Sequence, residues 1–122
     1  MELAKALDVR KGVTAIIGAG GKTTLLLALA RELAQAARVI VTTTTHIYLP
    51  DGFPCLLQPG EAEIAAALEK DPCICVGKPA NEGKLTAADV PVRNLAELAD
   101  YVLVEADGAH GRPAKAHADY EP

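Results

Sequence analysis

The chain has 122 residues, which is enough for one domain with a modest hydrophobic core. Half of the residues are hydrophobic and 23% are charged, a composition that excludes an intrinsically disordered protein. The net charge is −4 and no basic cluster is present, which argues against nucleic acid as a partner. The N-terminus lacks the features of a secretory signal, and the longest strongly apolar stretch, residues 25–30, is too short to span a membrane. We therefore expect a cytoplasmic protein without membrane contact.

Four short runs rich in Val and Ile predict β-strands, at residues 12–17, 38–43, 73–76 and 101–106. They are apolar throughout instead of alternating with polar residues, which is typical of central strands in a parallel sheet covered on both faces. Helix-forming segments lie between them, at residues 23–37, 60–70 and 94–101. The last begins with Asn94 and has Glu97 three residues later, as in a capping box. The alternation predicts an α/β fold, a three-layer sandwich with a mainly parallel sheet.

The remaining segments are predicted to be loops, including "YLPDGFP" (residues 48–54) and "GKPANEGK" (residues 77–84). The tail after residue 106 is polar and rich in Gly and Pro, so we expect no further element there. It is either a loop on a small domain or the point where a longer fold is interrupted. We favour the second, and expect one domain over residues 1–122 that is truncated at its C-terminal end.

The three cysteines, Cys55, Cys73 and Cys75, are an odd number, which argues against a disulfide framework. Cys73 and Cys75 occupy alternate positions of a predicted strand, so we interpret them as small residues that pack on one face. Metal binding by this Cys-x-Cys pair is the alternative, although no partner Cys or His lies nearby.

The segment "GAGGKTT", residues 18–24, joins a predicted strand to a predicted helix and has the features of a phosphate-binding loop. Its glycines allow the backbone to approach a phosphate, and Lys22 would counter the phosphate charge. The hydroxyl of Thr23 would bind Mg²⁺, and Thr24 can contact a phosphate oxygen. The alternative is a glycine-rich turn whose lysine is merely solvated. The predicted nucleotide-binding residues of this loop are Gly18, Ala19, Gly20, Gly21, Lys22, Thr23 and Thr24.

The usual loop has a glycine six residues before the lysine, where this chain has Ile16. The shorter form, GxxGK[ST], resembles the loop of the Mur ligases, which reads Gly-Thr-Asn-Gly-Lys-Thr. The missing glycine therefore indicates a variant of the motif.

A second candidate lies in "YVLVEADGAHGRP", where an apolar strand ends in Glu105 and Asp107. Two residues apart on a strand, they would share one face and could direct a carboxylate to Mg²⁺. Alternatively, Asp107 only caps the following turn. We expect the pair to lie beside the phosphate loop, because both would be at the carboxyl edge of a parallel sheet.

A third candidate is "VTTTTHIY", at the end of the second predicted strand. Thr42 and Thr43 can simply continue that strand. Thr44, Thr45 and His46 are better placed to face the site, with the His46 imidazole as a hydrogen-bonding or proton-transfer group.

The stretches "GAGGKTT", "VTTTTHIYLP" and "ADYVLVEADGAHGRPAKAHADYEP", in this order, resemble the YqeC family. Its members are described as selenium cofactor biosynthesis proteins or accessory proteins of selenium-dependent molybdenum hydroxylases, and run to roughly twice this length. The resemblance implies a P-loop NTPase-like fold and a role in maturing such a hydroxylase. It also implies that Thr44, Thr45 and His46 line the nucleotide site and that Glu105, Asp107 and Gly108 form its acidic wall.

Two positions depart from the family pattern. His110 stands where Arg or Lys is expected, although Arg112 could substitute, and "KAHADYEP" replaces "KAPAEHEP". The loss of a basic residue at position 110 puts in doubt a role there in stabilising phosphate charge.

The leading functional prediction is a Mg²⁺-dependent factor that binds and hydrolyses ATP or GTP. Lys22 and Mg²⁺ would neutralise phosphate charge, and Glu105 or Asp107 would orient the ion or the attacking group. The alternatives are a nucleotide-switched binding module and an ATP-dependent ligase or kinase-like enzyme related to the Mur ligases. The expected partners are a molybdenum hydroxylase or a selenium or molybdopterin compound. We also expect self-association, because the predicted elements leave sheet uncovered and an edge unpaired.

Overall fold

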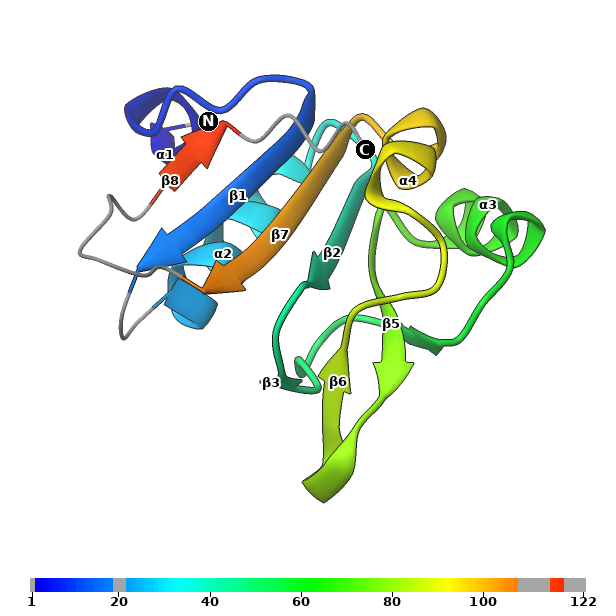
Figure 1. Cartoon of the computed structure of the whole chain (residues 1–122). Coiled ribbons are helices and arrows are strands. Elements are labelled where there is room, and N and C mark those ends of the chain that lie inside the picture. Colours follow the sequence, from blue (N-terminus) through cyan, green and yellow to red (C-terminus); the bar gives the residue numbers. More distant parts are fainter. Residues whose placement is uncertain (1, 19–21, 108–114, 118–122) are drawn as a thin grey trace.

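The computed structural model describes residues 2–18, 22–107 and 115–117, which form one mixed sheet between two layers of helices (Figure 1). In chain order the elements are α1 (Glu2–Ala6), β1 (Gly12–Gly18), α2 (Lys22–Leu33), β2 (Val39–Thr43), β3 (Ile47–Tyr48), β4 (Cys55–Leu57), α3 (Glu61–Lys70), β5 (Cys73–Pro79), the 3₁₀ turn η1 (Asn81–Gly83), β6 (Lys84–Thr86), α4 (Val92–Leu98), β7 (Tyr101–Asp107) and β8 (Lys115–His117).

The centre of the sheet is parallel. Strands β5, β2, β7 and β1 lie side by side in this order, and β4 pairs parallel with β5. Three short strands are antiparallel: β8 pairs with β1, β6 with the end of β5, and β3 with β6. The four predicted strands are therefore present, and the prediction of an α/β fold with a mainly parallel sheet is confirmed.

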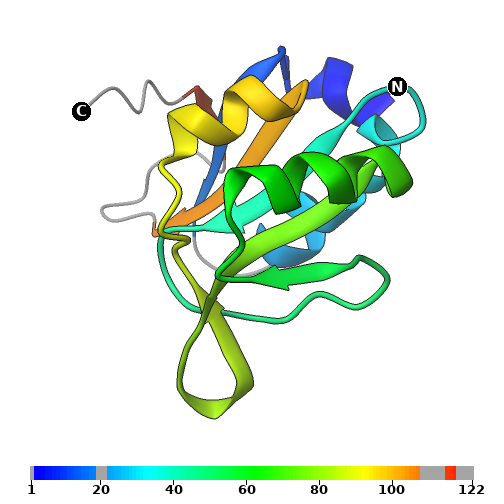
Figure 2. The ribbon, with the colours of Figure 1, turned by 90° about the vertical axis from the view of Figure 1, so that its right-hand side faces the viewer.

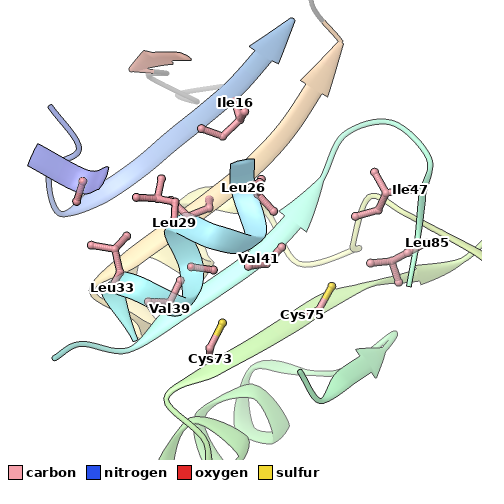
Figure 3. Close-up of a cluster of buried hydrophobic side chains, with 13 residues drawn as sticks. Ile16, Leu26, Leu29, Leu33, Val39, Val41, Ile47, Cys73, Cys75 and Leu85 are labelled. Carbon is pink, nitrogen blue, oxygen red and sulfur yellow. The ribbon is translucent and has the colours of Figure 1, made fainter. Parts of the chain in front are cut away.

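Helices cover both faces of the central strands. Helices α1 and α2 pack on one face and α3 and α4 on the other, as the two views at right angles show (Figures 1 and 2). In β2, Val39 and Val41 belong to the core under α2 (Figure 3), whereas Ile40 belongs to the core under α3 and α4. All three are fully buried, which explains why the central strands are apolar at every position.

Two helices differ from their predicted bounds. Helix α2 ends at Leu33 instead of residue 37, and residues 34–36 form a turn before β2. Helix α4 begins at Val92, with Pro91 as its N-cap residue, so the predicted capping box at Asn94 is wrong. The reason is that the carbonyl of Pro91 already accepts hydrogen bonds from the backbone of Asn94, and the Asn94 side chain instead donates to Glu61 on α3 at 3.0 Å.

The segment predicted as a loop at residues 77–84 is largely extended. Strand β5 continues to Pro79, and after η1 the chain returns as β6, which forms an antiparallel extension at one end of the sheet (Figure 2). Gly77 makes this close pairing possible, because a Cβ there would lie 2.5 Å from Cγ of Leu85 and 2.6 Å from the carbonyl oxygen of Thr86.

The expectation of no further element after residue 106 is also wrong. Strand β8 pairs antiparallel with Thr14–Ile16 of β1, with Ala116 opposite Ala15. The edge of β1 thus has a neighbouring strand. The composition of the tail concealed this strand, because a three-residue strand is stabilised by its partner and not by its own propensity.

Candidate functional site

The three segments singled out in the sequence meet at the carboxyl edge of the parallel sheet. In the β1–β7 ladder Gly18 lies opposite Asp107 and Ile16 opposite Glu105. In the β2–β7 ladder Thr43 lies opposite the same Glu105. The ends of β1 and β7 lie together beside the first turn of α2 (Figure 1). This is the edge at which open α/β sheets bind their ligands.

Glu105 is the centre of this edge. It is only 3% exposed, and it lies on the face of β7 toward α2, two residues after the core residue Leu103. Its Oε1 accepts a hydrogen bond of 2.5 Å from the hydroxyl of Thr23, in the first turn of α2. Two residues predicted to bind the same metal ion, 82 positions apart in the chain, are therefore in direct contact.

A carboxylate in this position is costly unless positive charge or hydrogen bonds compensate its burial. The Thr23 hydroxyl supplies one hydrogen bond. The expected positive charges are the Lys22 ammonium group and Mg²⁺. Carboxylate and hydroxyl oxygens are hard donors of the kind that Mg²⁺ binds, so Thr23 and Glu105 fit this ion chemically.

Part of the predicted loop lies outside the described residues. The loop residues Ala19, Gly20 and Gly21 lie outside the described residues. The same holds for Gly108, His110 and Arg112, which follow β7. For three further residues the structure describes the backbone only. Gly18 is the last residue of β1, Lys22 is the first residue of α2, and Asp107 is the last residue of β7. Thr24, the second threonine of the motif, is exposed.

Thr43 organises the site, although sequence reasoning assigned it only to the strand. Its hydroxyl donates to the carbonyl oxygen of Glu105 at 3.0 Å and accepts from the backbone N–H of Thr45 at 3.0 Å. The N–H of Thr44 donates to the same Glu105 carbonyl at 3.0 Å. A threonine hydroxyl that accepts the N–H two residues later is a local turn motif, and this spacing in "TTTT" could have indicated it.

The other residues of this segment have different surroundings. Thr42 is buried, and its hydroxyl donates to the carbonyl of Val76 at 2.7 Å, on the side away from α2. Thr44 and His46 are exposed, and Thr45 is half-buried. The carbonyl of Thr45 accepts a 2.7 Å hydrogen bond from the hydroxyl of Thr86 on β6. The turn after β2 is thus fixed to Glu105 on one side and to the antiparallel extension on the other.

An open hollow of the described surface lies elsewhere. Its volume is about 660 Å³, and residues 34–38 and 97–100 line it at the amino ends of β2 and β7. It is open and lies at the edge opposite Glu105.

Cys73 and Cys75 are buried in the core under α2, which confirms their packing on one face of a strand (Figure 3). Within the described residues no group of three or more His, Cys, Asp or Glu side chains could hold a metal ion. The Cys-x-Cys metal site therefore finds no support in this part of the chain.

Fold and site together define an α/β protein in which the end of β1 and the first turn of α2 lie beside an acidic strand end at the carboxyl edge of the sheet. The chain belongs to the YqeC family: the family model described as "YqeC protein" matches residues 14–122. The chain is 40% identical over 124 aligned residues to "Uncharacterized protein YqeC" of Escherichia coli (strain K12), an alignment that covers 93% of this chain and 47% of the relative. The chain thus spans about half the length of this curated relative.

No solved structure matches the chain. Among the described residues, no helix is both long enough and apolar enough to cross a lipid bilayer.

Proposed function

We propose that this chain binds ATP or GTP with Mg²⁺ and hydrolyses it. The hydrogen bond between Thr23 and Glu105 carries the proposal. In P-loop NTPases the metal ion is held by the hydroxyl that follows the loop lysine and by a carboxylate at the end of a neighbouring strand. Here a hydroxyl and a carboxylate in these two positions of the motif are already in contact.

Each residue would have a distinct role. The loop backbone and the first turn of α2 would bind the phosphates through their N–H groups, and Lys22 would neutralise phosphate charge. Thr23 and Glu105 would hold Mg²⁺, with Asp107 as a further carboxylate at the same strand end. The bound ion would supply charge stabilisation for phosphoryl transfer. His46, exposed beyond the turn at Thr43–Thr45, would serve as a proton-transfer or hydrogen-bonding group.

The family resemblance provides the biological context of the proposal. It points to the maturation of a selenium-dependent molybdenum hydroxylase, with that enzyme or a selenium or molybdopterin compound as the partner. The short loop, similar to that of the Mur ligases, leaves phosphorylation or activation of a substrate as a variant of the same chemistry. These roles rest on the sequence motifs alone.

A nucleotide-switched binding module is the second candidate, and one observation favours it. The turn after β2 is bonded to Glu105 through Thr44 and to β6 through Thr45 and Thr86. A change at the metal side of the site could therefore reach the antiparallel extension, where Tyr48 is 70% exposed. Turnover that stays slow until a partner protein is added would favour the switch. Turnover driven by a small selenium or molybdopterin compound would favour the enzyme.

Calorimetric titration of ATP and GTP, each with and without Mg²⁺, tests the central proposal. We expect binding of at least one of the two nucleotides that strengthens when Mg²⁺ is present, and release of phosphate in a coupled assay. The absence of binding of both nucleotides under both conditions would contradict the proposal.

A further inference from the structure

Three cysteines lie close together in the fold, but they are not equivalent. Cys73 and Cys75 are on β5, and Cys55 is the first residue of β4, which pairs parallel with β5. Cys73 and Cys75 are buried in the core under α2, and Cys55 is half-buried and packs against the same core. All three side chains therefore lie on one face of the sheet, and the pairing of β4 with β5 decides which of them meet.

The register of the two strands selects one pair. Cys55 lies directly opposite Cys75. Neighbouring strands are about 4.8 Å apart, which is within the Cα separation of about 4.4 to 6.8 Å found in disulfides. Cys73 and Cys75 are two residues apart along one strand, about 6.6 Å, and their parallel Cβ vectors hold their sulfurs too far apart for a bond. Cys73 has its ladder partner, Val39, on the other side, in β2.

The three thiols also differ in their burial and in their pKa. The Cys75 thiol beside it lowers the pKa of Cys55 to about 7, while desolvation by burial and the Asp51 carboxylate oppose this shift. As a protonated thiol, Cys55 donates to the carbonyl oxygens of Pro50 and Phe53, each 3.7 Å from its sulfur. Burial raises the pKa of Cys73 to about 12, and the contact with Cys55, followed by burial, raises the pKa of Cys75 as well. Cys55 is thus the most accessible of the three thiols, and of the two buried thiols only Cys75 lies directly opposite it.

We propose that Cys55 and Cys75 form a redox-active thiol pair, in which Cys55 reacts first with an oxidant such as a low-molecular-weight disulfide and Cys75 resolves the product into an intramolecular disulfide.

The chemistry balances with glutathione disulfide as the oxidant. The Cys55 thiolate attacks one sulfur of glutathione disulfide, forms a mixed disulfide and releases one glutathione thiolate, which takes up a proton. The Cys75 thiol gives up its proton, and its sulfur attacks the sulfur of Cys55. The bond to glutathione breaks and the second glutathione leaves. Two cysteine thiols are oxidised, and one glutathione disulfide is reduced to two glutathione molecules.

The bond would join the edge strand β4 covalently to β5. It would close the segment between Cys55 and Cys75, which contains α3, into a loop. Closing a loop restricts the unfolded chain, so the oxidised protein should melt at a higher temperature than the reduced one. This inference is independent of nucleotide binding.

The test equilibrates the full chain with glutathione disulfide, blocks the remaining thiols with an alkylating reagent, and maps disulfides by mass spectrometry of peptides. We expect one intramolecular disulfide, between Cys55 and Cys75, and alkylation of Cys73 only after unfolding. The matched control, Cys73→Ser, should form the same disulfide. Cys55→Ser should form none, and Cys75→Ser should stop at a glutathione adduct on Cys55.

Because Cys75 is fully buried, its variant could fail to fold, so a second measurement uses the wild-type protein alone. Under native conditions Cys55 should be alkylated at least ten times faster than Cys73. Equal alkylation rates, a disulfide involving Cys73, or full retention of three thiols after equilibration would each overturn the proposal.

Discussion

The hydroxyl of Thr23 donates a 2.5 Å hydrogen bond to Oε1 of Glu105, and so connects the first turn of α2 to the end of β7. The contact exists because β7 is inserted between β1 and β2 in the sheet, next to the strand that leads into α2. Every second residue of β7 faces α2, and at position 105 this residue is a buried glutamate where Leu103, two residues earlier, is apolar.

Thr23→Val and Glu105→Gln should weaken nucleotide binding in the presence of Mg²⁺ more than in its absence. Each removes an oxygen donor or a charge on the metal side. A hydrogen bond to a charged group contributes about 1.5–3 kcal/mol, which corresponds to roughly 10- to 150-fold in affinity. Calorimetry with and without Mg²⁺ measures the difference. Thr42→Val is the matched control, since its hydroxyl bonds to Val76 on the other side of the sheet. If a variant weakens nucleotide binding equally with and without Mg²⁺, the substituted residue is not on the metal side.

Lys22→Ala should reduce the binding of ATP and GTP below detection while the melting temperature stays unchanged. Lys22 is the first residue of α2, where a lysine would contact phosphate and not the core. Lys70→Ala, at the exposed last position of α3, removes the same charge far from the phosphate loop and should leave binding unaffected. Unchanged affinity of Lys22→Ala for both nucleotides would show that the glycine-rich connection is only a turn.

The attachment of α1 to α2 should depend on pH. The Glu32 carboxylate accepts hydrogen bonds from the backbone N–H groups of Leu3 at 2.8 Å and Ala4 at 2.7 Å. These bonds, the one from Ala4 first, lower the pKa of Glu32 below its ordinary value of 4.5. A carboxyl group whose pKa is lowered by folding stabilises the fold above the unfolded value, and this contribution is lost as the pH falls through the folded value.

We therefore expect the amide NMR signals of Leu3 and Ala4 to be constant above pH 4.5 and to shift as the pH is lowered below it. Glu32→Gln keeps the shape of the side chain but does not titrate, so its signals should stay constant over the same range. A transition at or above the ordinary carboxyl pKa would contradict the assignment.

Gly77→Ala should destabilise the antiparallel extension. A Cβ at this position would meet Cγ of Leu85 at 2.5 Å and the Thr86 carbonyl at 2.6 Å, so β6 must move. Overpacking of this kind costs about 1–3 kcal/mol. Chemical denaturation measures the loss. Gly60→Ala is the control, because the nearest atom there is 3.8 Å away, in the flexible side chain of Glu63. An equal effect of the two substitutions would rule out the steric explanation.

The chain should self-associate through the edge that carries its exposed large hydrophobic side chains. Among the described residues these are Tyr48 and Leu49, at and just after β3, and Leu57 in β4. Exposed apolar side chains beside unpaired backbone favour association. Light scattering should show a mass above that of the monomer, and Leu57→Lys should reduce it. A monomer at every concentration would contradict this prediction.

Local sequence was sufficient for much of the framework. The all-apolar runs predicted the four long strands and their burial on both faces, because residues such as Ile40 and Val41 face two different helix layers. The glycine-rich stretch after the first strand predicted the position of the strand–helix connection. The start of α4 was missed, since Pro91 and the contact of Asn94 with Glu61 outweighed the capping-box pattern.

The rule that parallel strands end at one edge of a sheet predicted that Glu105 lies near the loop, but only the tertiary structure decided which side chains contact each other. The strand order β5–β2–β7–β1 brings Glu105 between Thr43 and the helix that carries Thr23, and no local pattern encodes that order. The short strands β6 and β8 likewise exist because a neighbouring strand offers them hydrogen bonds, not because their residues favour extended structure. Periodicity and composition act over a few residues and determine the elements. The contacts of a site depend on how distant elements pack, and that is a property of the whole fold.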